Sequence, residues 1–186
     1  MNKIARKSNK LLFLIFISVI HLKANNLCYE KTFKCITDPV IMYSIAEIEH
    51  HVSRNIGYPY LISFNNKTIA QKAIHDKYLS NLFIDNRTLD CMNKQKCKKT
   101  LQYIRNKYTN NLDCGGFQIN DKSWGFNSDI YFSIQKSYQC ACKMVQKHNK
   151  NEWSFENIAK YHSKTKSVNK KYREKLKQTI KKNIDI

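Results

Sequence analysis

A glutamate on the apolar face of a predicted helix is the clearest chemical signal in the sequence. The residues that define this face recur at helical spacing: Ile41, Ile45, Ile48 and Val52. Glu49 follows Ile45 by four residues and precedes Val52 by three, so it should point inward. Such a carboxyl either pairs with a cation or lies in a pocket that raises its pKa, and the second case makes a general acid. Glu47 is turned by about 200° from Glu49, so we expect it to face solvent.

A short loop further along the chain gathers two glycines and two side-chain amides. It runs from Asp113 to Asn120 and includes Gly115, Gly116 and Gln118. Because glycine has no side chain, this kind of backbone lets a polar ligand approach closely, although an ordinary turn has a similar composition. The loop is therefore a candidate binding segment.

A later apolar helix ends in aromatic and polar side chains. Tyr161, His162 and Ser163 follow one another there, and Tyr172 lies in the next predicted helix. Taken singly, each aromatic residue is more often part of a core than of a site. The order of the glutamate, the Gln118 loop and the tyrosines along the chain is therefore stronger evidence for a functional site than any one of these residues alone.

Caps and breakers along the chain predict helices joined by one extended patch. Asp38 and Pro39 fit an N-cap and a first helical position, and the helix should run to about Asn55 before Gly57 and Pro59 stop it. An extended stretch is expected at 57–65 and helical segments at 68–108, 129–148, 155–161 and 168–182, with loops around 86 and 93. The last segment is a basic helix. We expect a single, mainly α (α+β) domain with a small β patch.

Length and charge restrict the class of protein. The 186 residues, 42% of them hydrophobic, can bury one core but not two large domains. The 33 Lys and Arg outnumber 14 Asp and Glu, giving a formal net charge of +19. Such a charge indicates a polyanionic partner without choosing among nucleic acid, anionic lipid and an acidic wall polymer.

The first residues have the pattern of an export signal. Basic residues from Lys3 to Lys10 precede an apolar run at 11–20, and its length of about ten residues fits a signal peptide better than a membrane span. We place cleavage near Ala24, so that 1–24 is the signal and 25–186 the mature domain; an uncleaved anchor is the alternative. Because exported proteins rarely meet nucleic acid, we expect a periplasmic, wall-associated protein with no nucleic-acid partner and no stable transmembrane span after processing.

All 7 cysteines lie beyond this signal, where an oxidising compartment favours disulfides. Two or three disulfides are expected, although sequence does not fix which cysteines pair. Proximity suggests the following pairs, with one thiol left over: Cys28 with Cys35, Cys91 with Cys97, and Cys114 with Cys140 or Cys142. The spacing lacks the paired CxxC ligands of a zinc site, so neither a metal nor another cofactor is expected.

Taken in order, these segments resemble the soluble (SLT) type of lytic transglycosylase domain in the lysozyme-like superfamily. The resemblance is particularly to the small exported members that accompany type IV secretion and conjugation systems. It covers about residues 39–180 and rests on the glutamate helix, on Tyr161 and Tyr172, and on the loop at 115–120, which is similar to the family's Gly-Leu-Phe-Gln-Ile-Asn pattern. His50 departs from the family's Ser after the glutamate, and His162 departs from its Tyr-Asn pair.

The resemblance implies a lysozyme-like fold with a cleft between the first helix and the Gln118 loop. Glu49 would act as the single general acid/base that cleaves the β-1,4 bond between N-acetylmuramic acid and N-acetylglucosamine and leaves 1,6-anhydromuramic ends. The implied substrate-binding residues are Gly115, Gln118, Asn120, Tyr161, His162 and Tyr172. The partners would be peptidoglycan glycan strands and proteins of a secretion or conjugation apparatus.

Two other functions fit the same residues. A lysozyme-type muramidase would hydrolyse the same bond with a second carboxylate, for which Asp113 is the nearby candidate. A non-catalytic, wall-binding component of a secretion system would use the cleft without turnover. The basic helix at 168–182 fits either a solvated surface or attraction to an anionic wall.

Overall fold

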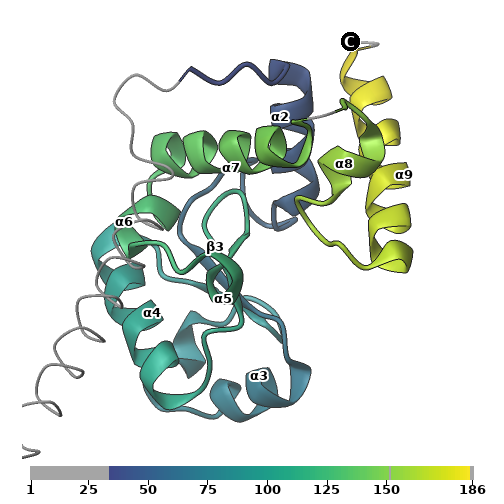
Figure 1. Cartoon of the computed structure of the whole chain (residues 1–186). Helices are drawn as coiled ribbons and strands as arrows, with labels where there is room; N and C mark the ends of the chain where they lie inside the picture. The colour runs from purple at the N-terminus through teal and green to yellow at the C-terminus, as the bar shows by residue number, and fades with distance from the viewer. Residues whose placement is uncertain (1–33, 151, 185–186) are drawn as a thin grey trace, which may run out of the picture.

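The computed structural model describes residues 34–150 and 152–184. The proposed signal peptide at 1–24 and Cys28 lie outside the described residues. Within them the chain is mainly helical with one small sheet, which confirms the predicted fold class at that level (Figure 1). The helices are α2 (Pro39–Glu49), α3 (Lys67–Ile74), the 3-10 turn η1 (Ser80–Leu82), α4 (Lys94–Lys107), α5 (Asp121–Trp124), α6 (Ser128–Tyr131), α7 (Ile134–His148), α8 (Phe155–Ala159) and α9 (Lys166–Ile184). The strands are β1 (Leu61–Phe64), β2 (Thr88–Asp90), β3 (Leu112–Cys114) and β4 (Ile119–Asn120).

The four strands form one antiparallel sheet in the order β2-β1-β3-β4. Ile62 of β1 pairs with Leu89 of β2 on one side and with Cys114 of β3 on the other. Figure 1 shows α3 and α4 on one side of the strands and α2, α7, α8 and α9 on the other. The sheet therefore joins two groups of helices, and residues at its edges can face both groups.

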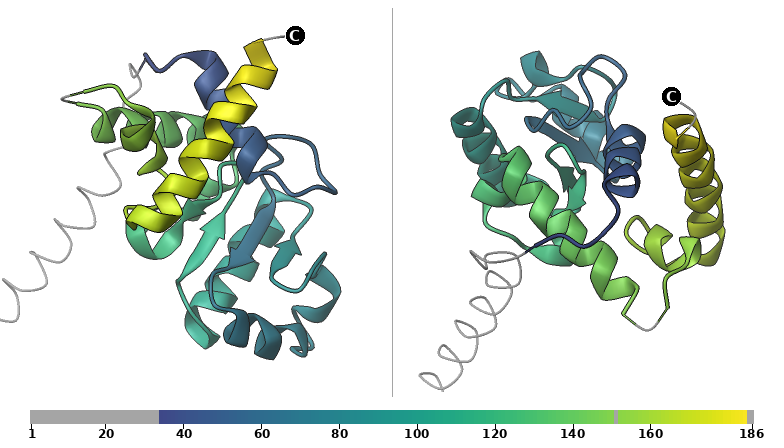
Figure 2. Two further views of the ribbon diagram at one scale, coloured as in Figure 1. Left: turned by 90° about the vertical axis from the view of Figure 1, so that its right-hand side faces the viewer. Right: turned by 90° about the horizontal axis from the view of Figure 1, so that it is seen from above.

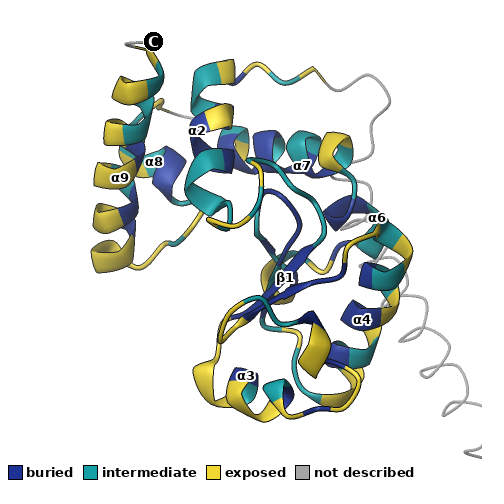
Figure 3. Ribbon diagram, turned by 180° about the vertical axis from the view of Figure 1, so that it is seen from behind, coloured by how far each residue is buried: buried dark blue, intermediate teal, exposed yellow. Residues whose placement is uncertain are grey.

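One apolar core runs through both groups. Phe64 of β1, Leu101 of α4, Val145 of α7 and Leu176 of α9 all belong to it and are almost fully buried. Figure 3 shows the strands buried and the outer face of α9 exposed. Burying a side chain of this size contributes about 1.5–3 kcal/mol, so the core fixes the positions of the helix ends that carry the candidate site.

Helix α2 begins as predicted but ends earlier. Asp38 Oδ1 accepts a hydrogen bond from the Val40 N–H at 2.7 Å, and Pro39 fills the first turn. The helix stops at Glu49 because His50 takes an extended conformation. The predicted extension to Asn55 is therefore wrong, and Val52, expected on the buried face, is 90% exposed.

The expectation that Glu47 faces solvent is also wrong. Its side chain is 15% exposed and turns toward α9, where Lys182 Nζ lies 2.6 Å from Oε1. Asn183 donates to Glu47 Oε2 at 2.9 Å and to Ser44 Oγ at 3.1 Å. A helix face that is polar in sequence is thus covered by another helix, and Figure 2 shows α9 alongside α2.

The short strands are the elements that sequence patterns miss. Only β1 lies in the predicted extended stretch; β2 falls within the expected helical region, and β3 and β4 form a hairpin where a loop was expected. Strands of two or three residues are too short to show an alternating pattern. The long predicted helix at 129–148 is likewise two helices, because Ser133 caps the start of α7.

The cysteine pairing differs from the one that proximity suggests. Cys35 is bonded to Cys142 across 107 residues of sequence, with the two Cα atoms 5.9 Å apart. Cys91, Cys97 and Cys114 are buried free thiols. Burial raises the pKa values of Cys97 and Cys114, so both stay protonated. The predicted pairing of Cys28 with Cys35 is therefore wrong, as are those of Cys91 with Cys97 and of Cys114 with Cys140 or Cys142.

Alkylation of the unreduced, denatured chain followed by peptide mapping tests this arrangement. We expect modification of Cys91, Cys97 and Cys114 and protection of Cys35 and Cys142. Labelling of Cys35 and Cys142 in the exported protein would contradict the assigned disulfide.

A buried aspartate ties α3 and α4 together away from the cleft. Asp76 Oδ2 accepts hydrogen bonds from Lys107 Nζ at 2.6 Å and from the hydroxyls of Tyr103 and Tyr108, each at 2.8 Å. Burial alone would raise the pKa of Asp76, but these donors and the Tyr78 N–H lower it overall. The carboxylate is therefore a structural hub whose charge matters to folding.

Asp76→Asn should lower the free energy of unfolding by about 1–2 kcal/mol, because buried donors lose a charged acceptor while the half-exposed Lys107 is partly screened by solvent. Urea unfolding measures the loss. Since the folded-state pKa is depressed, this contribution should be present above about pH 4 and fade as pH falls below it. Asp129→Asn, at a surface carboxylate paired with Lys94 and Lys98, is the matched control and should cost less than about 1 kcal/mol. Equal losses of unfolding free energy in the two variants would contradict the structural role assigned to Asp76.

Candidate active-site cleft

Glu49 is the last residue of α2, and its side chain is 11% exposed. Its Oε1 atom is buried and makes no hydrogen bond within the described part of the chain. His162 Nδ1 lies 3.4 Å from this oxygen, which is an ion-pair distance rather than a well-formed hydrogen bond. This oxygen has almost no accessible surface and faces the protein interior, so the part of the carboxyl that a ligand can reach is its other oxygen.

Two hollows meet at Glu49. One has a volume of about 840 Å³ and the other of about 360 Å³. The residues that line both are Glu49, Asn65, Asp113, Gln118 and His162. The carboxyl therefore lies near the middle of one extended cleft, with room for a chain-like ligand on either side of it.

The Gln118 loop turns tightly beneath this cleft. Gln118 has a left-handed backbone, with φ of 44°, and its Nε2 donates to the Gly115 carbonyl at 2.8 Å. A Cβ on Gly115 would lie 2.1 Å from the Tyr131 carbonyl oxygen, and one on Gly116 would lie 2.3 Å from that of Gly57. The glycines are needed for close backbone packing, and the strained residue that faces the cleft is Gln118.

An aromatic pair supports the histidine beside Glu49. The rings of His162 and Tyr172 stack with centroids 4.6 Å apart and planes at 7°. The Tyr172 hydroxyl is buried and, like Glu49 Oε1, makes no hydrogen bond to a described residue. Burial and the neighbouring Glu49 charge raise the pKa of Tyr172, so its phenol stays neutral.

Tyr161 links the end of α8 to the Gln118 loop. Its buried hydroxyl donates to the Phe117 carbonyl oxygen at 2.5 Å. Burial raises the pKa of Tyr161, and the charges of Glu49 and Asp113 raise it further. The side chain lines the larger hollow, so it both fixes the loop and forms part of the cleft wall.

Asp113 is a second carboxyl on the cleft wall. Burial raises its pKa, and the nearby Glu49 charge adds to the effect, while a hydrogen bond from Asn120 opposes it. Asn120 Nδ2 donates to Asp113 Oδ1 at 2.9 Å, and Asn120 Oδ1 caps α5 through the Ser123 N–H. Asn120 thus has a clear structural role in addition to lining the larger hollow.

The structure brings most of the predicted site residues together. Glu49, Gln118, Asn120, Tyr161 and His162 line the cleft. Tyr172 lines neither hollow but lies against His162, and buried Gly115 also lines neither.

Sequence reasoning gave no role to Asn65, which lines both hollows directly after β1. Its position at the end of an extended stretch was the available signal.

The described residues contain neither a metal-binding group nor a membrane-spanning helix. No group of three His, Cys, Asp or Glu side chains there is arranged to hold a metal ion. No helix in that part of the chain is long and apolar enough to span a bilayer.

The Glu49–His162 contact makes a prediction about titration. Glu49 is the main cause of a raised His162 pKa; Asp113 raises it further, while partial burial and Arg87 lower it. The pairing should therefore stabilise the fold fully below about pH 6.5 and lose its effect as pH rises through the folded-state pKa. We expect NMR titration to place the His162 pKa above its ordinary value and Glu49→Gln to move it down. Glu47→Gln is the control and should leave it in place. An unchanged His162 pKa in Glu49→Gln would contradict the pairing.

Comparison with known proteins assigns no relative to the chain. No family model, curated protein or solved structure matches it.

Proposed function

We propose that the chain is an exported peptidoglycan lytic transglycosylase with a lysozyme-like fold. The observation that supports this best is Glu49, a nearly buried carboxyl that lines both hollows of an extended cleft. A linear polysaccharide can occupy both sides of such a carboxyl, with the bond to be cleaved beside it. The order of Glu49, the Gln118 loop and Tyr161 in sequence supports the same family.

The proposed reaction uses one carboxyl twice. Glu49 first donates its proton to the glycosidic oxygen as the bond from that oxygen to the muramic C1 breaks. The Glu49 carboxylate then takes the proton of the muramic C6 hydroxyl, and the C6 oxygen bonds to C1 to close the 1,6-anhydro ring. No water is consumed, and Glu49 regains its proton.

The surrounding residues have definable roles in this reaction. Gln118 and Asn65 line both hollows and offer amides to sugar hydroxyls there. His162 lies 3.4 Å from the acid and can stabilise its carboxylate form between the two steps. Tyr172 holds the imidazole ring in plane.

A muramidase that hydrolyses the same bond is the second candidate. It is favoured by one observation, that Asp113 lines both hollows together with Glu49. The raised pKa of Asp113 weighs against it, because a second carboxyl must be ionised to act as nucleophile or base. The products separate the two reactions, since only the transglycosylase leaves 1,6-anhydromuramic ends.

Export and wall association are part of the proposal. The apolar run at 11–20 supports secretion, and the Cys35–Cys142 disulfide fits an oxidising compartment such as the periplasm. Peptidoglycan strands would be the substrate, and proteins of a secretion or conjugation apparatus would be the partners. A wall-binding subunit without turnover would use the same cleft.

Mass spectrometry of sacculi digested with the mature protein tests the function. We expect 1,6-anhydro products from the wild type and a loss of at least about 100-fold in kcat for Glu49→Gln, because the amide has no proton to transfer. Glu47→Gln makes the same change two residues earlier in α2, on the side that faces α9. Its amide oxygen can still accept a hydrogen bond from Lys182, so turnover should stay close to the wild type.

Hydrolysed reducing ends in place of anhydro ends would favour the muramidase. Binding of sacculi without any product would favour the non-catalytic subunit, and equal turnover in the two glutamine variants would remove Glu49 from the mechanism.

A further inference from the structure

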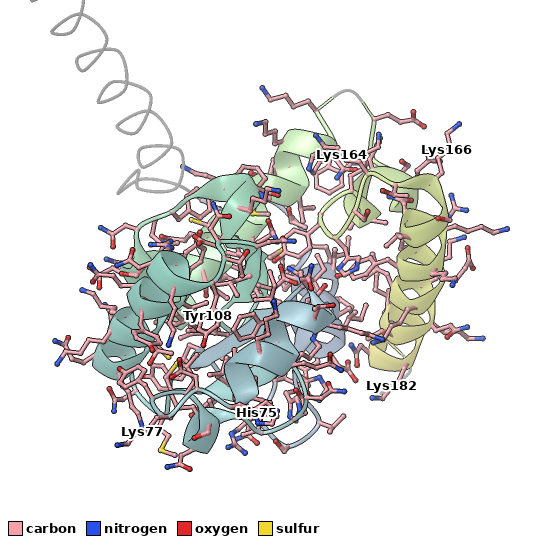
Figure 4. The ribbon with its side chains drawn as sticks, turned by 90° about the horizontal axis from the view of Figure 1, so that it is seen from below. His75, Lys77, Tyr108, Lys164, Lys166 and Lys182 are labelled. Atoms are coloured by element: carbon pink, nitrogen blue, oxygen red, sulfur yellow. A yellow bond between two sulfur atoms is a disulfide. The ribbon has the colours of Figure 1, made fainter. Side chains whose placement is uncertain are left out.

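One end of the cleft carries an excess of positive charge. The larger hollow, beyond Glu49, is lined by four lysines, here termed the lysine arm: Lys122, Lys147, Lys160 and Lys164. They come from four separate segments: α5, α7, the residue after α8, and the connection to α9. Figure 4 shows Lys164 at the opposite end of α9 from Lys182, so the arm is distinct from the pair that binds Glu47.

The charge of the lysine arm is not paired with a carboxylate of the described residues. None of the four lysines makes an ion pair within the described residues, and the only acidic side chains that line the hollow are Glu49 and Asp113. Lys160 Nζ donates to the neutral Asn157 Oδ1 at 2.6 Å, and Lys147 Nζ lies 5.4 Å from the ring centroid of Trp124. These contacts hold two of the ammonium groups in place and leave their charge available.

The effect of the arm can be seen at His148, which lines the same hollow. Partial burial lowers the pKa of His148, and Lys164, Lys147 and Lys160 each lower it further. Among the described residues, no acidic group opposes this lowering of the His148 pKa. Three segments therefore bring cations close enough to act together on one site.

The smaller hollow is different. His51 Nε2 lies 3.1 Å from Asp85 Oδ2, so an acid and a base already face each other there. Arg87 is its other basic residue beside the histidines. The cleft is consequently asymmetric in charge, and a bound chain would place its more anionic side in the larger hollow.

We propose that the lysine arm binds the carboxylates of the peptide stems carried by muramic acid, so that the cleft selects peptide-substituted glycan over bare glycan. This inference rests on the proposed function. Several exposed cations around one hollow attract a flexible, multiply charged peptide without requiring a single fixed contact.

Binding of labelled glycan oligomers of equal length, with their stems or with the stems removed by an amidase, tests the proposal. We expect the wild type to bind the stem-bearing oligomer about tenfold more tightly, since three or four partly exposed ion pairs of modest strength act together. The preference should shrink as salt is raised from 0.1 to 1 M, where the Debye length falls from about 10 Å to about 3 Å.

The variant Lys147→Gln/Lys160→Gln/Lys164→Gln should lose the preference while binding bare glycan as the wild type does. A matched control changes three exposed lysines of α9 that make no ion pair in the described structure: Lys170→Gln/Lys171→Gln/Lys181→Gln. It removes the same charge and should keep the preference. Circular dichroism melting verifies that both variants fold.

Equal affinity of the wild type for both oligomers, binding of neither, or equal effects of the two triple variants would overturn the proposal. Turnover is measured in a separate assay. Cleavage without a stem preference would support the proposed reaction and contradict the role proposed for the lysine arm. A stem preference without cleavage would support that role and indicate that the chain is a binding protein.

Discussion

The packing of α9 against α2 is the contact on which the candidate site depends. Glu47 at one side of α2 is held by Lys182 and Asn183 of α9. About three helical turns nearer the start of α9, Tyr172 supports the ring of His162 beside Glu49. The same docking thus covers one glutamate as a structural anchor and leaves the other facing the cleft. Two carboxyls two residues apart acquire different roles because of what α9 places next to each.

The sequence predicted the parts of this arrangement that depend on local pattern. The helical spacing before Glu49 placed it on the inner side of α2, and the Asp38–Pro39 cap located the start of that helix. The Gln118 loop and Tyr161 were expected near the glutamate and line the same cleft. These signals are local or family-like, so they can be read without knowing how the chain folds.

Other features depend on contacts between distant segments and were not predictable. The cover over Glu47 comes from residues 135 and 136 positions later, and the Cys35–Cys142 bond spans 107 positions. Gly115 looked like a ligand contact, but the space at its Cα is taken by the Tyr131 backbone. The positive end of the cleft likewise arises only when four segments meet. In each case the residue type indicated what kind of contact the residue could make, but the sequence did not show which distant residue it would contact.

The central claim is that Glu49 lies at the bond to be cleaved, in the middle of a bound glycan strand. A crystal structure of the Glu49→Gln variant with a peptidoglycan oligomer tests this most directly. The account predicts sugar rings in both hollows, with a glycosidic oxygen within hydrogen-bonding distance of the residue 49 side chain and Gln118 contacting an adjacent sugar. A glycan bound only in one hollow, or elsewhere on the surface with residue 49 uncontacted, would contradict it.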